Sequence, residues 1–136
     1  MRLLMSVTSV FLLAIAAASC SDSIGPGSVV GVWVQDNSPP GNSLDMVLSL
    51  NGSAVSGQGS WCGEALGCGL TTVTGTATRN RIHLVTNLDN GDVQTFDGAL
   101  TSSDSFAGTE TETPPGGTSF SVAQSFHRGG DPVQTQ

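Results

Sequence analysis

Few side chains in this sequence are of the types that carry out catalysis, and their spacing defines no catalytic set. His83 lies between Ile82 and Leu84, on what we expect to be the polar face of a strand, and His127 ends another strand. Serine is abundant, yet no Gly-x-Ser-x-Gly motif marks one as a nucleophile. Both histidines are therefore expected to be exposed, and the sequence predicts a non-enzymatic protein without catalytic residues.

The acidic residues are further candidates for chemistry. Glu110 and Glu112 are two apart in a predicted strand and share a face, with Asp97 expected near them across a hairpin. A pair of carboxylates is what glycoside hydrolysis requires, but we interpret these acids as exposed side chains that keep a lysine-free protein soluble. The run from Asp89 to Asp92 lacks the spacing and the distal Glu of a calcium loop, which indicates an ordinary turn.

The chain contains three cysteines. Cys62 and Cys68 lie in a short segment bracketed by glycines, and we expect them to form a disulfide that joins two neighbouring strands. The short loop limits its stabilising effect to about 2 kcal/mol. The alternative is a metal site that adds His83 and His127, but no pair of ligands has the close spacing typical of zinc sites. We therefore expect neither a metal ion nor a cofactor.

The N-terminus has the pattern of an export signal. Arg2 precedes an uncharged apolar run, which ends in small residues just before Cys20. This layout predicts a signal peptide at residues 1–19, and an uncleaved membrane anchor is the alternative. The stretch Ala17-Ala18-Ser19-Cys20 resembles the lipobox of bacterial lipoproteins, although Leu is commoner at the position of Ala17.

The lipobox resemblance implies that Cys20 becomes the lipidated first residue of an exported protein of the bacterial cell envelope. Ser21, rather than Asp, follows the cysteine, which implies sorting to the outer membrane, facing the periplasm or the cell surface. The membrane is then one partner, reached through the lipid anchor. Ordinary cleavage near Ala18, which would leave Cys20 as a free thiol, is the alternative.

The composition of the chain excludes two further classes of partner. The 136 residues suit one domain, carry a net charge of −7 and include no lysine. Nucleic-acid binding needs clustered Lys or Arg, and so does a basic helix on a membrane surface. The four basic residues provide neither cluster, so both kinds of contact are excluded.

Polarity alternates with a period of two between residues 29 and 128, and no segment has the period of a helix. We predict eight strands, at residues 29–35, 44–50, 53–61, 70–78, 81–88, 93–100, 106–112 and 119–127. Short strands joined by tight turns form antiparallel hairpins, and closing the meander removes its exposed edges. The expected fold is all-β: an eight-stranded antiparallel up-and-down meander closed into a small barrel, preceded by a cleaved signal peptide.

The barrel domain occupies residues 29–128 in this interpretation. Residues 20–28 form the lipidated cysteine and a flexible tether, and residues 129–136 form a disordered tail. Within the strands, a glycine repeatedly follows an inward apolar residue by two positions, at Gly57, Gly75, Gly98 and Gly108. We expect these glycines to mark corners of the barrel wall, and space for a ligand is the alternative.

Gly31-Val32-Trp33 in the first strand, the eight-stranded meander and Arg128 at the end of the last strand resemble the calycin pattern, which lipocalins and avidins share. The resemblance implies that Trp33 closes one end of the barrel and that Arg128 packs over it in a cation–π contact worth about 0.5–2 kcal/mol. The chain has no tyrosine, and Trp61 is its only other tryptophan, so much of the avidin ligand set is missing. The alternative is a β-sandwich with Trp33 in its core.

A barrel at the cell envelope without a catalytic set predicts a binding module. Its ligand is expected to be a small apolar molecule or a peptide, or its partner an envelope protein. Function concentrates on loops held by rigid strands. We expect contacts from Trp61, Glu64 and Leu66 around the disulfide loop, and from Asn37, Pro39 and Pro40 after the first strand. The alternatives are a barrel like those of periplasmic protease inhibitors, and a structural lipoprotein without a ligand.

Overall fold

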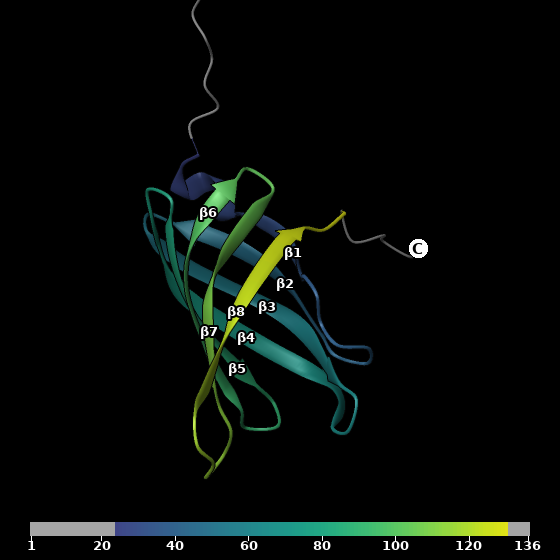
Figure 1. The fold of residues 1–136 in the computed structure, drawn as a ribbon. Coiled ribbons are helices and arrows are strands. Elements are labelled where there is room, and N and C mark those ends of the chain that lie inside the picture. Colours follow the sequence, from purple (N-terminus) through teal and green to yellow (C-terminus); the bar gives the residue numbers. More distant parts are fainter. Residues whose placement is uncertain (1–23, 131–136) are drawn as a thin grey trace, which may run out of the picture.

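The meander predicted from the sequence closes into a barrel (Figure 1). The computed structural model describes residues 24–130. Its strands are β1 (Gly31–Gln35), β2 (Ser43–Asn51), β3 (Ala54–Gly63), β4 (Gly67–Thr78), β5 (Arg81–Leu88), β6 (Val93–Ser102), β7 (Ser105–Thr113) and β8 (Phe120–Arg128). A 3-10 helix, η1 (Pro26–Val29), is the only helical element in this part of the chain. Every predicted strand is present, with ends that differ by a few residues.

The barrel is closed by a short pairing between its first and last strands. Residues 33–35 of β1 pair with residues 126–128 of β8, and every other pairing joins strands that are consecutive in the sequence. All of these pairings are antiparallel. The predicted fold class is therefore confirmed, and the alternative of a β-sandwich is wrong.

Alternating polarity decides which side chains fill the barrel. Leu44, Met46 and Leu48 of β2 are buried, whereas the threonines at every second position of β4, from Thr72 to Thr78, are exposed. Successive side chains of a strand point to opposite faces, so the apolar set of each strand reaches the interior. β-branched threonine also suits the outer face of a pleated sheet.

The inward glycines lie where neighbouring strands approach closely. A Cβ added to Gly75 would lie 2.0 Å from the carbonyl oxygen of His83, and one added to Gly108 would lie 2.2 Å from that of Asp97. At Gly57 and Gly98 the nearest backbone oxygen would be 2.4 Å away, which is again too close for a side chain. These positions match the predicted corners, since neighbouring backbone occupies the space that a ligand would need.

η1 precedes β1 and belongs to the packed domain. Val29, its last residue, is fully buried, and the indole Nε1 of Trp33 donates a hydrogen bond to its carbonyl at 2.7 Å. Residues 26–28, expected in the flexible tether, are therefore helical, and the first strand begins at Gly31 rather than at Val29. Pro26 favours this start because its fixed φ suits the first position of a helix.

Several predictions concern residues outside the described range. The signal peptide and Cys20 lie outside it, as do residues 131–136 of the predicted tail. Gly129, the first residue of that tail, donates a backbone hydrogen bond to Val32 at 2.9 Å. Between residues 24 and 130, no helix has the length and apolar character needed to cross a membrane.

The barrel has two different ends. η1 and the β2–β3, β4–β5 and β6–β7 connections lie at one end, where β8 also ends (Figure 1). We call this the closed end. The β1–β2, β3–β4, β5–β6 and β7–β8 connections lie at the opposite end, which we call the mouth.

Aromatic rings fill the closed half of the barrel. Phe106 and Phe126 stack with their centroids 4.8 Å apart, and Trp33 contacts Phe106 at 4.6 Å. Phe96 meets Phe126 edge to face at 5.6 Å. All four rings are buried, and the spacings are those that aromatic pairs prefer. This half of the interior is therefore solid.

Candidate functional site

The closed end is sealed by Trp33 and Arg128 in the arrangement that the calycin resemblance implies. The guanidinium carbon of Arg128 lies 4.5 Å from the ring centroid of Trp33, within the range of a cation–π contact. Arg128 also donates to the carbonyls of Val30 at 2.8 Å, Ser28 at 2.7 Å and Ser103 at 2.8 Å. One side chain thus ties the N-terminal segment and the β6–β7 turn to the end of β8.

The mouth stays open because β1 is short. Only the last three residues of β8, Phe126 to Arg128, pair with β1. The first half of β8 has no strand on that side among the described residues. Phe120 and Val122 share the inward face of β8 with Phe126 but are 50% and 45% exposed. They line an opening instead of a packed core.

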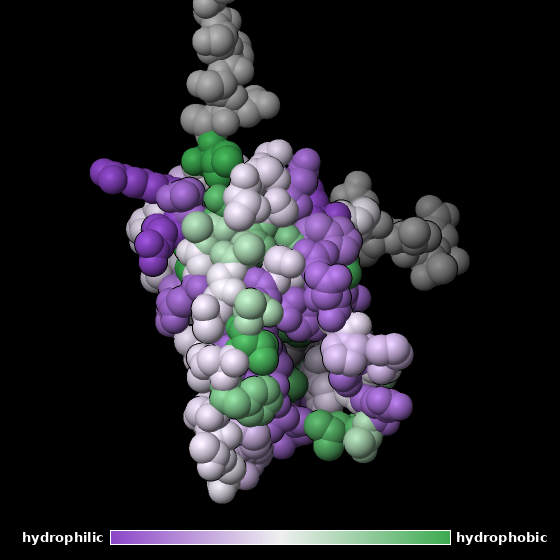
Figure 2. Space-filling view, viewed as in Figure 1, coloured by the Kyte–Doolittle hydropathy of each residue, from purple (hydrophilic) through white to green (hydrophobic). Residues whose placement is uncertain are grey.

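A cavity of about 480 Å³ lies in this opening, and we call it the mouth cup. Its apolar lining includes Leu44, Trp61, Leu66, Leu88, Phe120 and Val122. Its polar lining includes Gln35, Asp92, Gln94, Glu110, Glu112 and Gln124. Figure 2 shows the surface at this end divided into two lobes with a hollow between them. The volume falls within the range of small-molecule sites.

Glu110 is buried in the mouth cup, so the expectation of an exposed acid is wrong. The residue is 5% exposed, and it shares the inward face of β7 with the buried Phe106. Burial, followed by the negative charge of Glu112, raises the pKa of Glu110 to about 7. The pKa of Glu112 is also raised, first by burial and then by the charge of Asp92. The two glutamates therefore face a cavity instead of a solvated sheet surface.

Asp97 lies on the outer face of the barrel, away from Glu110, so its expected proximity to the glutamates is wrong. Alternation along β6 turns it outward, where its Oδ1 lies 2.7 Å from Nδ1 of His83. His83 and His127 are both substantially exposed, as predicted, and His127 contacts Asp36. In residues 24–130, no three His, Cys, Asp or Glu side chains are grouped closely enough to hold a metal ion.

Two acceptors face the mouth cup. Gln94 Oε1 is buried and accepts no hydrogen bond, and the raised pKa of Glu110 comes from burial and the charge of Glu112, with no hydrogen bond among its causes. Two side-chain amides of the lining already donate to other groups. Nε2 of Gln35 donates to Oε1 of Gln124 at 2.9 Å, and Nε2 of Gln124 donates to the carbonyl of Asp36 at 3.0 Å. The cup therefore offers buried acceptors to a ligand.

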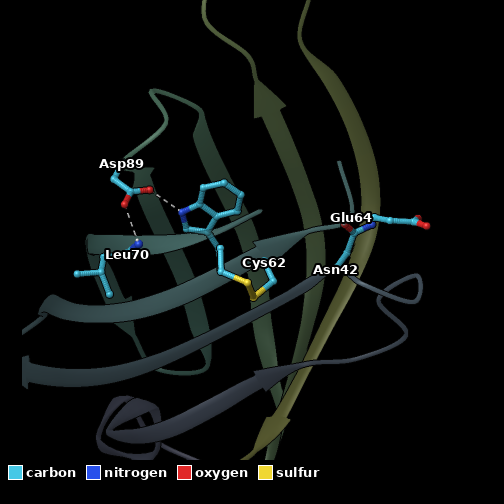
Figure 3. The surroundings of a disulfide bond; sticks show 7 residues. Asn42, Cys62, Glu64, Leu70 and Asp89 are labelled. Atoms are coloured by element: carbon cyan, nitrogen blue, oxygen red, sulfur yellow. Dashed lines mark hydrogen bonds between the residues drawn. A yellow bond between two sulfur atoms is a disulfide. The ribbon is translucent and has the colours of Figure 1, made fainter. Parts of the chain in front are cut away.

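A disulfide holds the wall of the mouth beside the cup (Figure 3). Cys62 and Cys68 are directly opposed in β3 and β4 and are bonded, as predicted. The neighbouring Trp61 donates Nε1 to Oδ1 of Asp89 at 2.8 Å, and Oδ2 of Asp89 accepts the Leu70 N–H at 3.0 Å. These bonds, that of Leu70 above all, hold the pKa of Asp89 below its ordinary value. Asp89 thereby fixes the β5–β6 turn to the disulfide hairpin.

The predicted contact residues are only partly brought together. Asn37, Pro39, Trp61 and Leu66 line the mouth cup. Glu64 and Pro40 are exposed on mouth loops but do not line it, and the Glu64 side chain points away from the disulfide in Figure 3. Trp61 is 6% exposed, so it acts mainly as part of the core.

Sequence reasoning missed most of the polar lining of the cup, although the sequence carries a signal for it. Gln94 and Gln124 each precede a buried phenylalanine of the same strand by two positions, and Glu110 follows Phe106 by four. Period-two alternation from these aromatic residues places all three side chains inside the barrel. The expectation that charged residues face solvent placed Glu110 on the outer face instead, which is wrong.

Comparison with known proteins adds no family to this description. No protein-family model, curated protein sequence or solved structure matches the chain. The structure alone therefore defines the class: an eight-stranded, all-antiparallel closed barrel, consistent with a calycin-like fold.

Proposed function

We propose that this protein is a lipid-anchored, non-enzymatic binding module of the bacterial cell envelope, which holds its ligand in the mouth cup. The observation that carries the proposal is the unequal filling of the barrel. Buried aromatic rings pack the closed half, whereas the inward residues Phe120 and Val122 are about half exposed around a cavity of about 480 Å³. Small barrels and their mouths are common places for ligands.

The geometry of the chain ends supports an anchored module. η1 lies at the closed end, and Cys20, the proposed site of lipidation, precedes Pro26 by only a few residues. A membrane held at that end leaves the mouth directed away from the lipid. The Cys62–Cys68 disulfide supports an extracytoplasmic site because disulfides persist in oxidising compartments.

The lining of the cup narrows the kind of ligand. Leu88 and Phe120 offer apolar contacts, but Glu110 and Gln94 add buried acceptors. A wholly apolar ligand leaves those acceptors without a donor, at a cost of about 1–3 kcal/mol each. The module therefore holds a small organic molecule or a peptide segment that has both apolar and polar parts.

A thermal-shift screen of the full chain tests the proposal. The library covers amines, sugars, fatty acids, haem and short peptides. At a ligand concentration 100-fold above Kd, binding to the folded state alone adds about 2.7 kcal/mol to the free energy of unfolding. We therefore expect at least one class to raise Tm by several degrees, and a flat screen across the library contradicts the proposal.

A matched pair of valine variants locates the site. Val122 lines the mouth cup and is 45% exposed, whereas Val47 lies on the outer face of β2 and is 49% exposed. Val122→Trp fills the cup and is expected to abolish the ligand-induced shift. Val47→Trp adds the same side chain outside the barrel and is expected to preserve it. A shift that survives Val122→Trp places the ligand elsewhere.

A further inference from the structure

We propose that the mouth cup selects ligands that carry a protonated amine or a guanidinium group, with the Glu110 carboxylate as the principal contact. This inference rests on the binding function proposed above and names its ligand class. The chemistry is a compact cation with several N–H donors attached to an apolar body. The source is either a free amine or a basic side chain of an extended peptide.

Gln94 Oε1 and the Glu110 carboxylate, which is ionised above a pH of about 7, are acceptors that face the cup. Glu110 is 5% exposed, with no hydrogen bond among the causes of its pKa shift, and Gln94 Oε1 is buried without a donor. Glu112 and Asp92 add two more carboxylates to the lining. An ammonium group has three donors and no acceptor, so it suits this set better than a hydroxyl or an amide does.

Charge is distributed unequally between the two ends of the barrel. The basic side chains of the described residues, Arg79, Arg81 and Arg128, all lie at the closed end. No Lys, Arg or His lines the mouth cup, whereas three carboxylates do. A cavity lined by one sign of charge concentrates ligands of the opposite sign, which favours cations and disfavours anions here.

The apolar lining favours an organic cation over a bare metal ion. Phe120, Val122 and Leu88 line the same cup as Glu110, and they can bury the hydrocarbon part of an arylalkyl amine. The carboxylates of the cup do not form a group of three that could hold a metal ion. The acceptors are thus placed to meet one end of a ligand whose other end is apolar.

Calorimetric titration of the full chain with matched compounds at pH 8, above the pKa of about 7 of Glu110, tests the selection. Phenethylamine, 2-phenylethanol and 3-phenylpropionate share an apolar ring and differ in charge. We expect phenethylamine to bind at least tenfold more tightly than either of the others. A blocked tripeptide with a central lysine, and its acetyl-lysine counterpart, separate a peptide source from a free amine. CaCl₂ serves as the metal probe and is expected not to bind.

Variants of Glu110 test whether its carboxylate contacts the amine. Glu110→Gln keeps the shape and removes the charge, so amine affinity is expected to fall at least tenfold. Glu110→Asp keeps the charge and is expected to retain the preference for amines, with weaker binding. The control is Asp45→Asn, which removes a carboxylate from the outer face of β2 and is expected to change nothing. Circular dichroism verifies that each variant is folded.

The outcomes separate this inference from the proposed function. If the neutral or anionic compounds bind the cup as tightly as the amine, or if Glu110→Gln leaves amine affinity unchanged, the cation selectivity is wrong while the binding module stands. Tight Ca²⁺ binding that depends on Glu110 also overturns it. If none of the compounds and no other ligand class binds, the proposed function fails as well.

Discussion

Arg128 concentrates several contacts in one side chain at the end of the last strand. Its guanidinium lies over the Trp33 ring and donates to carbonyls in the N-terminal segment and in the β6–β7 turn. Arg suits this position because its planar group stacks on an aromatic face while its edge donates in several directions. A lysine has one charged atom and cannot do both.

Replacing Arg128 with Ala is expected to lower the free energy of unfolding by about 2–4 kcal/mol, since it removes a cation–π contact and several hydrogen bonds. Arg128→Lys restores the charge alone and is expected to recover less than half of the loss. Urea denaturation measures the free energy of unfolding of both variants. Arg81→Ala is the control, because Arg81 is exposed and such changes stay within about 0.5 kcal/mol. An equal effect of the two Ala variants contradicts the assigned role.

Glu110 is expected to make the stability of the fold depend on pH. Its pKa is raised to about 7 in the folded chain, above its ordinary value of 4.5. The folded state therefore holds the proton more tightly than the unfolded state. The resulting stabilisation is complete below pH 4.5 and is lost as the pH rises through about 7.

Thermal unfolding between pH 5 and pH 8 measures this dependence. Glu110→Gln is expected to flatten the fall in Tm and to be more stable than the natural chain at pH 8 by about 1–2 kcal/mol, once hydration from the open cup is allowed for. Glu112 and Asp92, the other carboxylates of the cup, remain in the variant. Parallel curves for the two proteins contradict the burial of a proton-binding Glu110.

At the scale of elements, each strand combines an alternating apolar face with a glycine where a neighbour crosses closely. Gly75 of β4 is the clearest case, because the carbonyl oxygen of His83 in β5 occupies the place of a Cβ. The backbone cannot make that approach with any side chain present. The glycine thus sets the curvature that closure requires.

Gly75→Ala is expected to destabilise the barrel by about 2–3 kcal/mol, because β4 and β5 must separate to admit the methyl group. Gly27→Ala provides the control, since a Cβ there has open space around it. Guanidinium denaturation compares the two variants. A small, equal effect of both substitutions contradicts the tight corner at Gly75.

The same alternation explains how much could be predicted from the sequence. The meander, the Cys62–Cys68 disulfide and the exposed histidines follow from local pattern and compartment, and the structure confirms them. The mouth cup does not follow from local pattern, because it depends on where β1 stops pairing with β8, which is a contact between the two ends of the domain. Glu110 is an intermediate case. The alternation along its strand predicts an inward side chain, but its charge led to the wrong expectation of an exposed one.

At the scale of the whole molecule, the two ends of the barrel differ in their residues. The closed end carries the plug and the arginines and lies next to the segment that leads toward Cys20. The mouth carries the disulfide, the buried acids and the cup. The proposed lipid anchor and the proposed ligand site therefore lie at opposite ends of the barrel and do not compete for the same surface.

The outer wall has a further hollow of about 410 Å³, lined by residues that include Gly59, Leu70 and Asn87. It is a shallow feature of the β3–β5 surface and contains none of the buried acceptors of the mouth cup. It shares Leu88 with the mouth cup, but a ligand there would not contact Gln94 or Glu110. Any direct test of the proposed function must therefore distinguish the two locations.

The most direct measurement is an amide chemical-shift map of the ¹⁵N-labelled full chain, titrated with the tightest-binding compound of the screen. We expect the largest shifts at the amides of Gln94, Glu110 and Phe120, with Arg128 and its neighbours at the closed end unchanged. Shifts confined to Leu70 and Asn87 on the outer wall, or no saturable shift at any amide, would contradict a ligand site in the mouth of the barrel.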